Sequence, residues 1–401
     1  MKVGNRDLYL LMITSFTVSL GINAVEPIQP LFMVDVGATE LELGLIFAVS
    51  SLLGMASRIP LGILPNRIGR RIMITIASFT HIASLIFFSF VNDVVWFYPL
   101  MVLHTMIWGI FGPSAISLAS DTASPERIGT ILGLYYTSIG LGQFIGPLFC
   151  GILTEYVTYQ AIFIGLSIFP VLGLIATMRW KSMGRSEKMF DNERVSGAGE
   201  RIVDSFKRIL RSRNMICLCL SRIAFSIPVA IFGTLFSVWA KTELLFTPLL
   251  ISIIFSARGA ANSLIRMPTG SIVDKIGTKK PILLAFSLAF TAFFIFSVTS
   301  DFLVILIAVL IYGLGWGMRI VPDTTILTES VESRDRGLAL AILMSMFALG
   351  RSVGSLVAGV AYTLFPMYII FQMSAGILFL GFIIIAVAIK AKEPKLGPSI
   401  G

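Results

Sequence analysis

The chain alternates between long apolar stretches and short polar ones. Twelve apolar stretches can be read from it, each about as long as the 20 residues that cross the hydrocarbon core of a bilayer. They cover 8–33, 41–64, 72–91, 95–118, 128–153, 159–178, 215–240, 246–269, 281–300, 302–325, 337–362 and 366–389. This pattern predicts an all-α membrane protein with twelve transmembrane helices. It also predicts three parts: a first bundle at 1–178, a linker at 179–214 and a second bundle at 215–401.

The second half repeats the layout of the first at an offset of 208 positions. Arg58-Ile-Pro-Leu-Gly62 matches Arg266-Met-Pro-Thr-Gly270, and Trp108-Gly109 matches Trp316-Gly317. Internal repeats of this kind build transporters in which two similar units enclose a site near the middle of the bilayer. We therefore expect two pseudo-symmetric six-helix bundles.

Composition and charge agree with a membrane location. Hydrophobic residues make up 56% of the chain and charged residues 13%, against roughly 25% charged residues in soluble domains. The loops after the odd-numbered stretches are acidic and hold one basic residue, Lys241, whereas most Lys and Arg lie in the other loops and at both termini. Basic loops stay in the cytoplasm, so we expect a multi-pass protein of the cell membrane with both termini cytoplasmic. The net charge of +9 then reflects topology, and no nucleic-acid partner is expected.

The residues that carry enzyme chemistry are sparse. His81 and His104 are isolated in the sequence, and Cys217-x-Cys219 lacks the ligand number of a zinc site. We find no nucleophile–base pair or phosphate-binding loop in a plausible context. We expect a protein that is not an enzyme and that needs no metal or cofactor.

The linker ends in a basic amphipathic segment. Ile202, Val203, Phe206, Ile209 and Leu210 recur at helical spacing, and Arg and Lys occupy other positions of the same segment. Such a helix is suited to lie on an anionic lipid surface. The alternative is a solvated linker helix without a lipid role.

A glycine-rich basic loop follows the second stretch of each half. The first copy reads Gly62-Ile-Leu-Pro-Asn66-Arg67-Ile-Gly69-Arg70-Arg71, and the second reads Gly270-Ser-Ile-Val-Asp274-Lys275-Ile-Gly277-Thr-Lys279-Lys280. It resembles the signature loop of the major facilitator superfamily (Gly-x-x-x-Asp-Arg-x-Gly-Arg-Arg), with Asn66 in place of the acid. The resemblance implies a cytoplasmic gate, in which the basic residues pair with an acid at the end of the fourth span of a bundle. The residues assigned to this gate are Gly62, Asn66, Arg67, Gly69, Arg70, Asp121, Gly270, Asp274, Gly277 and Glu329.

Two further motifs narrow the resemblance. Leu20-Gly21-x5-Pro27-x-x-Pro30 is similar to the first-span motif of the twelve-span drug:proton antiporters. The fifth stretch carries their antiporter motif at Gly133, Gly142, Gly146, Pro147 and Gly151, with Cys150 where the family has glycine. Small residues there allow helices to approach closely. The family's fourth-span arginine is replaced by Thr105. The resemblance therefore does not establish that this chain has the family's usual proton relay.

Charges inside the apolar stretches mark candidate sites because each one is costly in lipid. Glu26 is the only acid embedded in the first half, and we expect it to couple transport to protons. The alternative is a fixed ion pair with an arginine such as Arg351. Arg319 and Asp323 are four residues apart on one helix face, which favours a local ion pair.

The resemblance to the superfamily implies a central cavity that spans 1, 4, 7 and 10 line and spans 2, 5, 8 and 11 flank, and polar and aromatic residues of these spans form the predicted substrate site. Its members are Asn23, Trp108, Gln143, Arg222, Arg258, Trp316 and Arg351. Arg258 and Arg351 could bind a carboxylate or phosphate, or could neutralise Glu26. Trp108 and Trp316 could stack on substrate or fill the core.

These features together predict a secondary active transporter that works by alternating access. The leading hypothesis is proton-coupled export of small amphipathic molecules, and the alternative is an organic-anion carrier that uses Arg258 and Arg351. A channel or receptor does not account for gate loops in both halves. The expected partners are a small-molecule substrate, the proton and the lipid bilayer, and we expect a monomer.

Overall fold

The computed structural model describes residues 5–63, 68–122, 128–180, 198–332 and 335–389, and every regular element in these ranges is a helix. The first half contains α1 (Asn5–Val25), α2 (Gln29–Asp35), α3 (Glu40–Ile63), α5 (Arg70–Ser89), the short η1 (Val94–Trp96), α6 (Phe97–Thr122), α7 (Ile128–Leu153), α8 (Tyr159–Leu166) and α9 (Ile168–Met178). The second half contains α10 (Ala198–Arg211), α11 (Arg213–Thr242), α12 (Pro248–Ile276), α13 (Lys279–Phe296), α14 (Phe302–Gly317), α15 (Ile320–Ser330), α16 (Arg336–Leu364) and α17 (Met367–Ala388). Twelve helical segments of the described chain are long and apolar enough to cross a membrane, which confirms the predicted number of spans.

Three spans that the sequence predicts as single helices are interrupted. Span 8–33 divides into α1 and α2, span 159–178 into α8 and α9, and span 302–325 into α14 and α15. A proline follows each interruption: Pro30, Pro170 or Pro322. Proline has no N–H group, so the carbonyl four residues earlier loses its helical partner. The twelve predicted spans are present, and three of them contain a break beside a proline.

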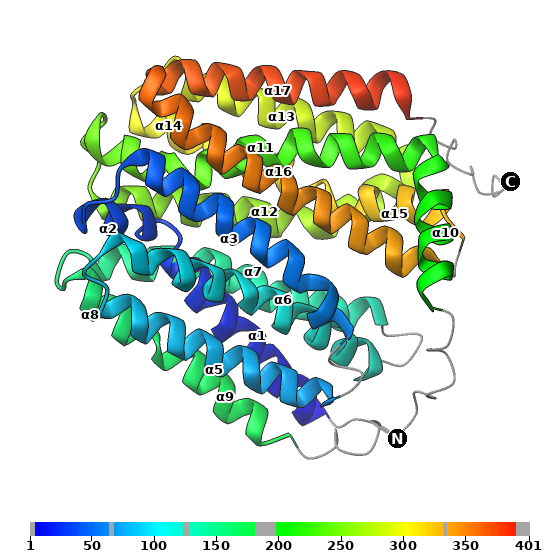
Figure 1. The fold of residues 1–401 in the computed structure, drawn as a ribbon, viewed down its shortest axis with the longest axis horizontal. Coiled ribbons are helices and arrows are strands. Elements are labelled where there is room, and N and C mark those ends of the chain that lie inside the picture. The colour runs from blue at the N-terminus through cyan, green and yellow to red at the C-terminus, as the bar shows by residue number, and fades with distance from the viewer. Residues whose placement is uncertain (1–4, 64–67, 123–127, 181–197, 333–334, 390–401) are drawn as a thin grey trace, which may run out of the picture.

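The two halves of the chain form two bundles that lie side by side. Helices α1 to α9 make the lower bundle in Figure 1, and α11 to α17 make the upper one. The first turn of α1 and the last turn of α17 lie toward the right of this view, and we call this end of the molecule the termini side and the other the far side. Within the bundles, α1 packs on α7 and α11 packs on α16.

The glycines of the sequence repeat allow close packing of helices in both bundles. A Cβ atom on Gly142 or Gly146 of α7 would stand 2.6 Å from backbone atoms of Leu20 in α1. A Cβ atom on Gly354 of α16, the counterpart of Gly146, would stand 2.5 Å from the carbonyl oxygen of Ile227 in α11. Each glycine therefore lets two backbones approach closely, which explains why the same spacing recurs 208 residues apart.

The bundles meet through two helix pairs, α3 with α16 and α7 with α12. Ser352 donates to the carbonyl oxygen of Ala48 (2.9 Å), and the backbone N–H of Leu148 donates to Ser256 Oγ (3.1 Å). Gly151 of α7 lies against Ser252 of α12 near the far side. These contacts hold the far side of the protein closed.

The same helix faces separate toward the termini side. Gly140 of α7 lies against Ser263 of α12, where a Cβ atom would stand 2.6 Å from the serine side chain. Gly133 and Gly270 lie two helical turns closer to the termini on these same two faces. Among the described residues, no atom comes within 4 Å of a Cβ built on either glycine. The interface between α7 and α12 therefore ends between these two levels.

Helix α10 connects the bundles and docks on the second one, beside α16 at the right of Figure 1. Arg208 Nε lies 2.8 Å from Asp335 Oδ2, and Arg208 Nη2 donates to Asp335 Oδ1 at 3.2 Å. Ile209 is buried, whereas Phe206 and Leu210 are exposed. The predicted lipid contact of this segment remains a prediction, with Phe206 and Leu210 as the available apolar side chains.

Candidate functional site

An ion pair joins the two bundles at the level of the middle of α12. Arg258 Nη2 of the second bundle donates to Glu26 Oε2 of the first at 2.5 Å. The Arg258 side chain is 7% exposed and that of Glu26 is 31% exposed. The alternative partner considered from the sequence, Arg351, does not make this contact. Because the partners belong to different bundles, a movement between the bundles at this level must change the pair.

Glu26 owes its position to the interruption after α1. The helix ends at Val25, residues 26–28 form a turn, and α2 begins at Gln29. Pro30 cannot donate to the carbonyl of Glu26, so the helix loses a hydrogen bond at this point. The turn leaves Glu26 partly exposed, whereas Val25 and Ile28 on either side are buried.

Aromatic rings surround the Arg258 guanidinium. Its central carbon lies 4.8 Å from the ring centre of Phe255, 5.3 Å from Trp316 and 5.4 Å from Phe232. Cation–π contacts of this kind contribute about 2 kcal/mol when they are desolvated. The rings therefore hold the Arg258 guanidinium in place in an apolar setting.

Tyr312 and Arg351 complete this site, and we call Glu26, Arg258, Tyr312, Trp316 and Arg351 the central cluster. Tyr312 stacks on Trp316 at 6.0 Å between ring centres. Glu26, Tyr312 and Arg258 are the ionisable groups that act electrostatically on Arg351. Within the described part of the chain, Tyr312 Oη and Arg351 Nε are buried without a hydrogen-bond partner. The cluster therefore holds two guanidinium groups, one carboxylate and unused donors.

Three other residues predicted for the substrate site lie outside the central cluster: Asn23 and Trp108 contact their own helices, and Gln143 contacts the opposite bundle. Asn23 donates to the carbonyl oxygen of Ser19 in its own helix (2.7 Å). Gln143 Oε1 accepts from Ser263 of α12 at 3.2 Å, and Trp108 stacks on Phe111 at 5.8 Å. Trp108 and Trp316 are related by the repeat, but only Trp316 belongs to the central cluster.

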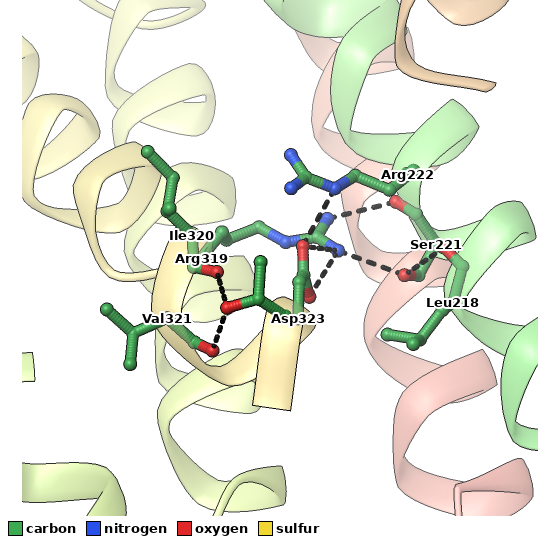
Figure 2. Close-up of polar contacts among 8 residues, drawn as sticks. Leu218, Ser221, Arg222, Arg319, Ile320, Val321 and Asp323 are labelled. Atoms are coloured by element: carbon green, nitrogen blue, oxygen red, sulfur yellow. Dashed lines mark hydrogen bonds and ion pairs between the residues drawn. The ribbon is translucent and has the colours of Figure 1, made fainter. Parts of the chain in front are cut away.

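Arg222 belongs to a second buried cluster, shown in Figure 2, between α11 and α15. Arg319 Nη2 lies 3.1 Å from Asp323 Oδ2, which confirms the predicted local ion pair. Arg222 Nε lies 2.8 Å from the same oxygen. Arg319 also donates to the backbone oxygen and the hydroxyl of Ser221, both at 3.0 Å. The assignment of Arg222 to one substrate site together with Arg258 is not what the structure shows, because Arg222 extends toward α15 instead.

Two glycines of the predicted gate, one in each half of the repeat, have the same kind of backbone conformation, with a positive φ. Gly69 precedes α5 with φ 96°, and Gly277 follows α12 with φ 78°. Side chains rarely tolerate this region, so both turns depend on glycine. Asn66 and Arg67 lie outside the described residues, as does the side chain of Asp121, while Gly62 lies in the last turn of α3.

The charged residues of the gate are not paired as predicted in the second half. Asp274 and Glu329 are exposed, and among the described residues no ion pair joins Glu329 to Lys279 or Lys280. Lys279 donates instead to the carbonyl of Ala386 at 2.7 Å. In the first half, Arg70 donates to the carbonyl of Ser117 at 3.4 Å. This arrangement agrees with separated helices at the termini side.

Comparison with known proteins identifies the family. The sequence model of the family described as Major Facilitator Superfamily matches residues 11–331 and 215–401. The chain belongs to the Major Facilitator Superfamily. It is therefore a multi-pass membrane protein that transports small molecules, as the loop motif implied.

Several superfamily members resemble the chain over most of its length. An uncharacterized MFS-type transporter of Methanocaldococcus jannaschii is 22% identical over 88% of this chain and 90% of its own. The quinolone resistance protein NorA of Staphylococcus aureus is 21% identical over 98% of both chains. The multi-drug resistance efflux pump PmrA of Streptococcus pneumoniae is 21% identical over 90% of both. The crystal structure of a mutant nucleoside transporter, NupG, aligns with a TM-score of 0.83 at 12% identity, over 96% of this chain and 100% of that one.

The antiporter-type motif of this superfamily member lies at helix contacts. Gly142 and Gly146 face α1, Gly151 faces α12, and Gly133 has open space around it. Pro147 lies inside α7 without ending the helix. The motif therefore shapes the surface of α7 that contacts both its own bundle and the opposite one.

One contact between the bundles was not predicted from the sequence. Lys241 of α11 donates to Asp35 at the end of α2 at 3.1 Å, and both side chains are exposed. The available signal was that Lys241 is the single basic residue in the acidic loops. The pair adds a charged contact to the closed far side.

Proposed function

We propose that this transporter exports small amphipathic molecules in exchange for protons, by alternating access. Two relatives support the export of drug-like molecules: one is named a quinolone resistance protein and the other a multi-drug resistance efflux pump. Both cover 90% or more of this chain. The antiporter-type motif of α7 supports the same hypothesis.

The charge pattern of the loops supports a cytoplasmic termini side. The structure then corresponds to an inward-facing state, with the far side closed and the predicted gate released. Substrate would enter from the cytoplasm or the inner leaflet. The gate residues would meet when the termini side closes, with Asp274 near a helix N-terminus of the opposite bundle. We expect the protein to act as a monomer in the cell membrane.

The ion pair between Glu26 and Arg258 is the observation that carries the proposal. While Glu26 is ionised, the pair holds the bundles together toward the far side and opposes movement of the empty protein. A proton on Glu26 removes this attraction, and a bound molecule that takes the place of Arg258 removes it as well. Because a proton and a cationic or polar substrate compete for the same carboxylate, they would cross the membrane in opposite directions.

The test is transport by purified protein in liposomes under a pH gradient. Glu26→Gln should reduce gradient-driven flux at least tenfold while substrate binding stays measurable, because the amide cannot exchange a proton. Glu155→Gln, which removes an exposed acid outside the central cluster, serves as the matched control. Wild-type flux by Glu26→Gln would exclude Glu26 as the coupling group.

The charge of the central cluster favours a second candidate, an organic-anion carrier. Arg258 and Arg351 face one carboxylate, and Arg351 Nε is without a partner among the described residues. An anion would take Arg258 from Glu26 and so bind together with a proton, whereas a cation would compete with the proton. Ligand binding by wild type and Arg351→Gln at mildly acidic and mildly alkaline pH separates the two. Anion binding that weakens at alkaline pH and is lost in Arg351→Gln supports this candidate.

A further inference from the structure

The second buried cluster holds a positive charge that no acid within it balances. Arg319 and Asp323 are 0% exposed and Arg222 is 5% exposed. Both guanidinium groups approach the same carboxylate, at 3.1 Å from Arg319 and 2.8 Å from Arg222. One carboxylate is therefore the counter-charge for two guanidinium groups in the interior of the second bundle.

The terminal nitrogens of Arg319 make four hydrogen bonds, although its Nε is buried without a partner among the described residues, and Arg222 carries the surplus charge. Arg319 donates to both Asp323 oxygens and twice to Ser221, and Phe225 and Phe286 lie 4.9 and 4.8 Å from its central carbon. Arg222 is close to Asp323, but its Nε is not aligned for a hydrogen bond, and its Nη2 is buried without a partner among the described residues. In Figure 2 the terminal nitrogens of Arg222 point away from Asp323.

The fold itself does not require these charges. The repeat aligns Arg319 with Phe111 and Asp323 with Ala115 in α6 of the first bundle. Both counterparts are buried apolar residues, so the same architecture is built there without ions. A buried ion pair is weak support for stability, and a surplus buried charge is unfavourable unless a counter-ion meets it.

We propose that Arg222 is an anion-binding site in the second bundle. Its terminal N–H groups would hold a small anion, either a halide or the carboxylate of an organic acid. A planar guanidinium suits this role because it offers two parallel donors and remains charged at every working pH. Phe347 of α16, 5.7 Å from the Arg222 central carbon, would cover the same group. The site shares no residue with the central cluster, so the proposal does not depend on proton coupling at Glu26.

Thermal unfolding of the full chain in detergent tests the proposal, because a ligand that binds the folded state raises its apparent stability. Chloride and benzoate are the two probes, each exchanged for bulky gluconate at constant ionic strength. At least one should raise the wild-type midpoint saturably. Arg222→Gln should lose this response, and Arg213→Gln should keep it, since Arg213 is an exposed arginine of the same helix. In gluconate alone, Arg222→Gln should unfold at a higher temperature than wild type, because the surplus charge is gone.

The pattern of responses identifies the ligand or refutes the site. A response to chloride alone indicates a halide site, and a response to benzoate indicates a site for the acid group of an organic molecule. Absence of both responses in wild type, or an unchanged response in Arg222→Gln, overturns the proposal. Loss confined to Arg351→Gln also overturns it, because the anion then binds in the central cluster. If Arg222→Gln does not fold, Arg222→Lys replaces it: a response weakened several-fold supports the site, and a wild-type response refutes it.

Discussion

Gly44 of α3 and Gly359 of α16 lie against each other across the interface between the bundles. A Cβ atom on Gly44 would stand 2.7 Å from the Cα of Gly359, and one on Gly359 would stand 2.9 Å from the carbonyl oxygen of Glu40. Gly151, the counterpart of Gly359 in the repeat, lies against Ser252 of α12 in the other helix pair. The closed far side therefore depends on the absence of side chains at matched positions of the two halves.

Gly359→Ala should shift the protein toward a state that is open at the far side. The added methyl group meets backbone atoms of α3 that cannot move aside, and overpacking of this kind costs about 1–3 kcal/mol. A population change of several-fold or more should appear in the distance between spin labels at Glu155 and Ser300, one on each bundle. Gly376→Ala is the control, because no atom lies within 4 Å of its added Cβ. An unchanged distance distribution in Gly359→Ala would mean that this contact does not hold the far side closed.

Lys241→Gln should weaken the far-side closure only slightly. Both side chains of the pair with Asp35 are exposed, and exposed ion pairs contribute about 0.2–1 kcal/mol to stability. The same label pair should report a few-fold shift at low ionic strength that disappears in concentrated salt, since salt screens exposed charges. Lys280→Gln removes a charge at the termini side and should not change this distance. A shift that persists in concentrated salt would argue against an electrostatic cause.

Gly277→Ala should destabilise the protein, whereas Gly270→Ala in the same loop motif should not. Gly277 has φ 78° and ψ 178°, a conformation that costs a residue with a side chain about 1–3 kcal/mol. Gly270 is helical, and an added Cβ meets nothing within 4 Å. Thermal unfolding of the two variants in detergent provides the comparison. Equal midpoints would show that the turn after α12 can relax.

Arg208→Gln should release α10 from the second bundle. The hydrogen bond to Asp335 raises the pKa of Arg208. Loss of the Arg208 proton therefore removes this stabilisation only at strongly alkaline pH. Hydrogen exchange in α10 should become faster in the variant at neutral pH, while Arg211→Gln, which changes an exposed residue of the same helix, should match wild type. Equal exchange in both variants would show that Ile209 and its neighbours suffice to dock α10.

The sequence already contained the number of spans, the two-bundle architecture and the repeated glycine positions. These features depend on local properties: an apolar length, a missing Cβ atom, or a turn that requires a positive φ. Gly69 and Gly277 illustrate this, because the conformation is fixed by one residue and its immediate neighbours. The breaks after Val25, Leu166 and Gly317 lie near prolines, but Pro113, Pro147, Pro228 and Pro268 lie inside helices that continue, so prolines alone do not predict where a span breaks.

Only the tertiary structure decided which buried charges meet. The sequence left both Arg351 and Arg258 open as partners of Glu26, and the contact is made by Arg258. Arg222 was assigned to the same site but reaches Asp323 in another cluster. Pairs that are 232 residues apart in the chain depend on how each helix is rotated and where it crosses its neighbours. That geometry is set by packing over the whole interface, and no local pattern in the sequence encodes it.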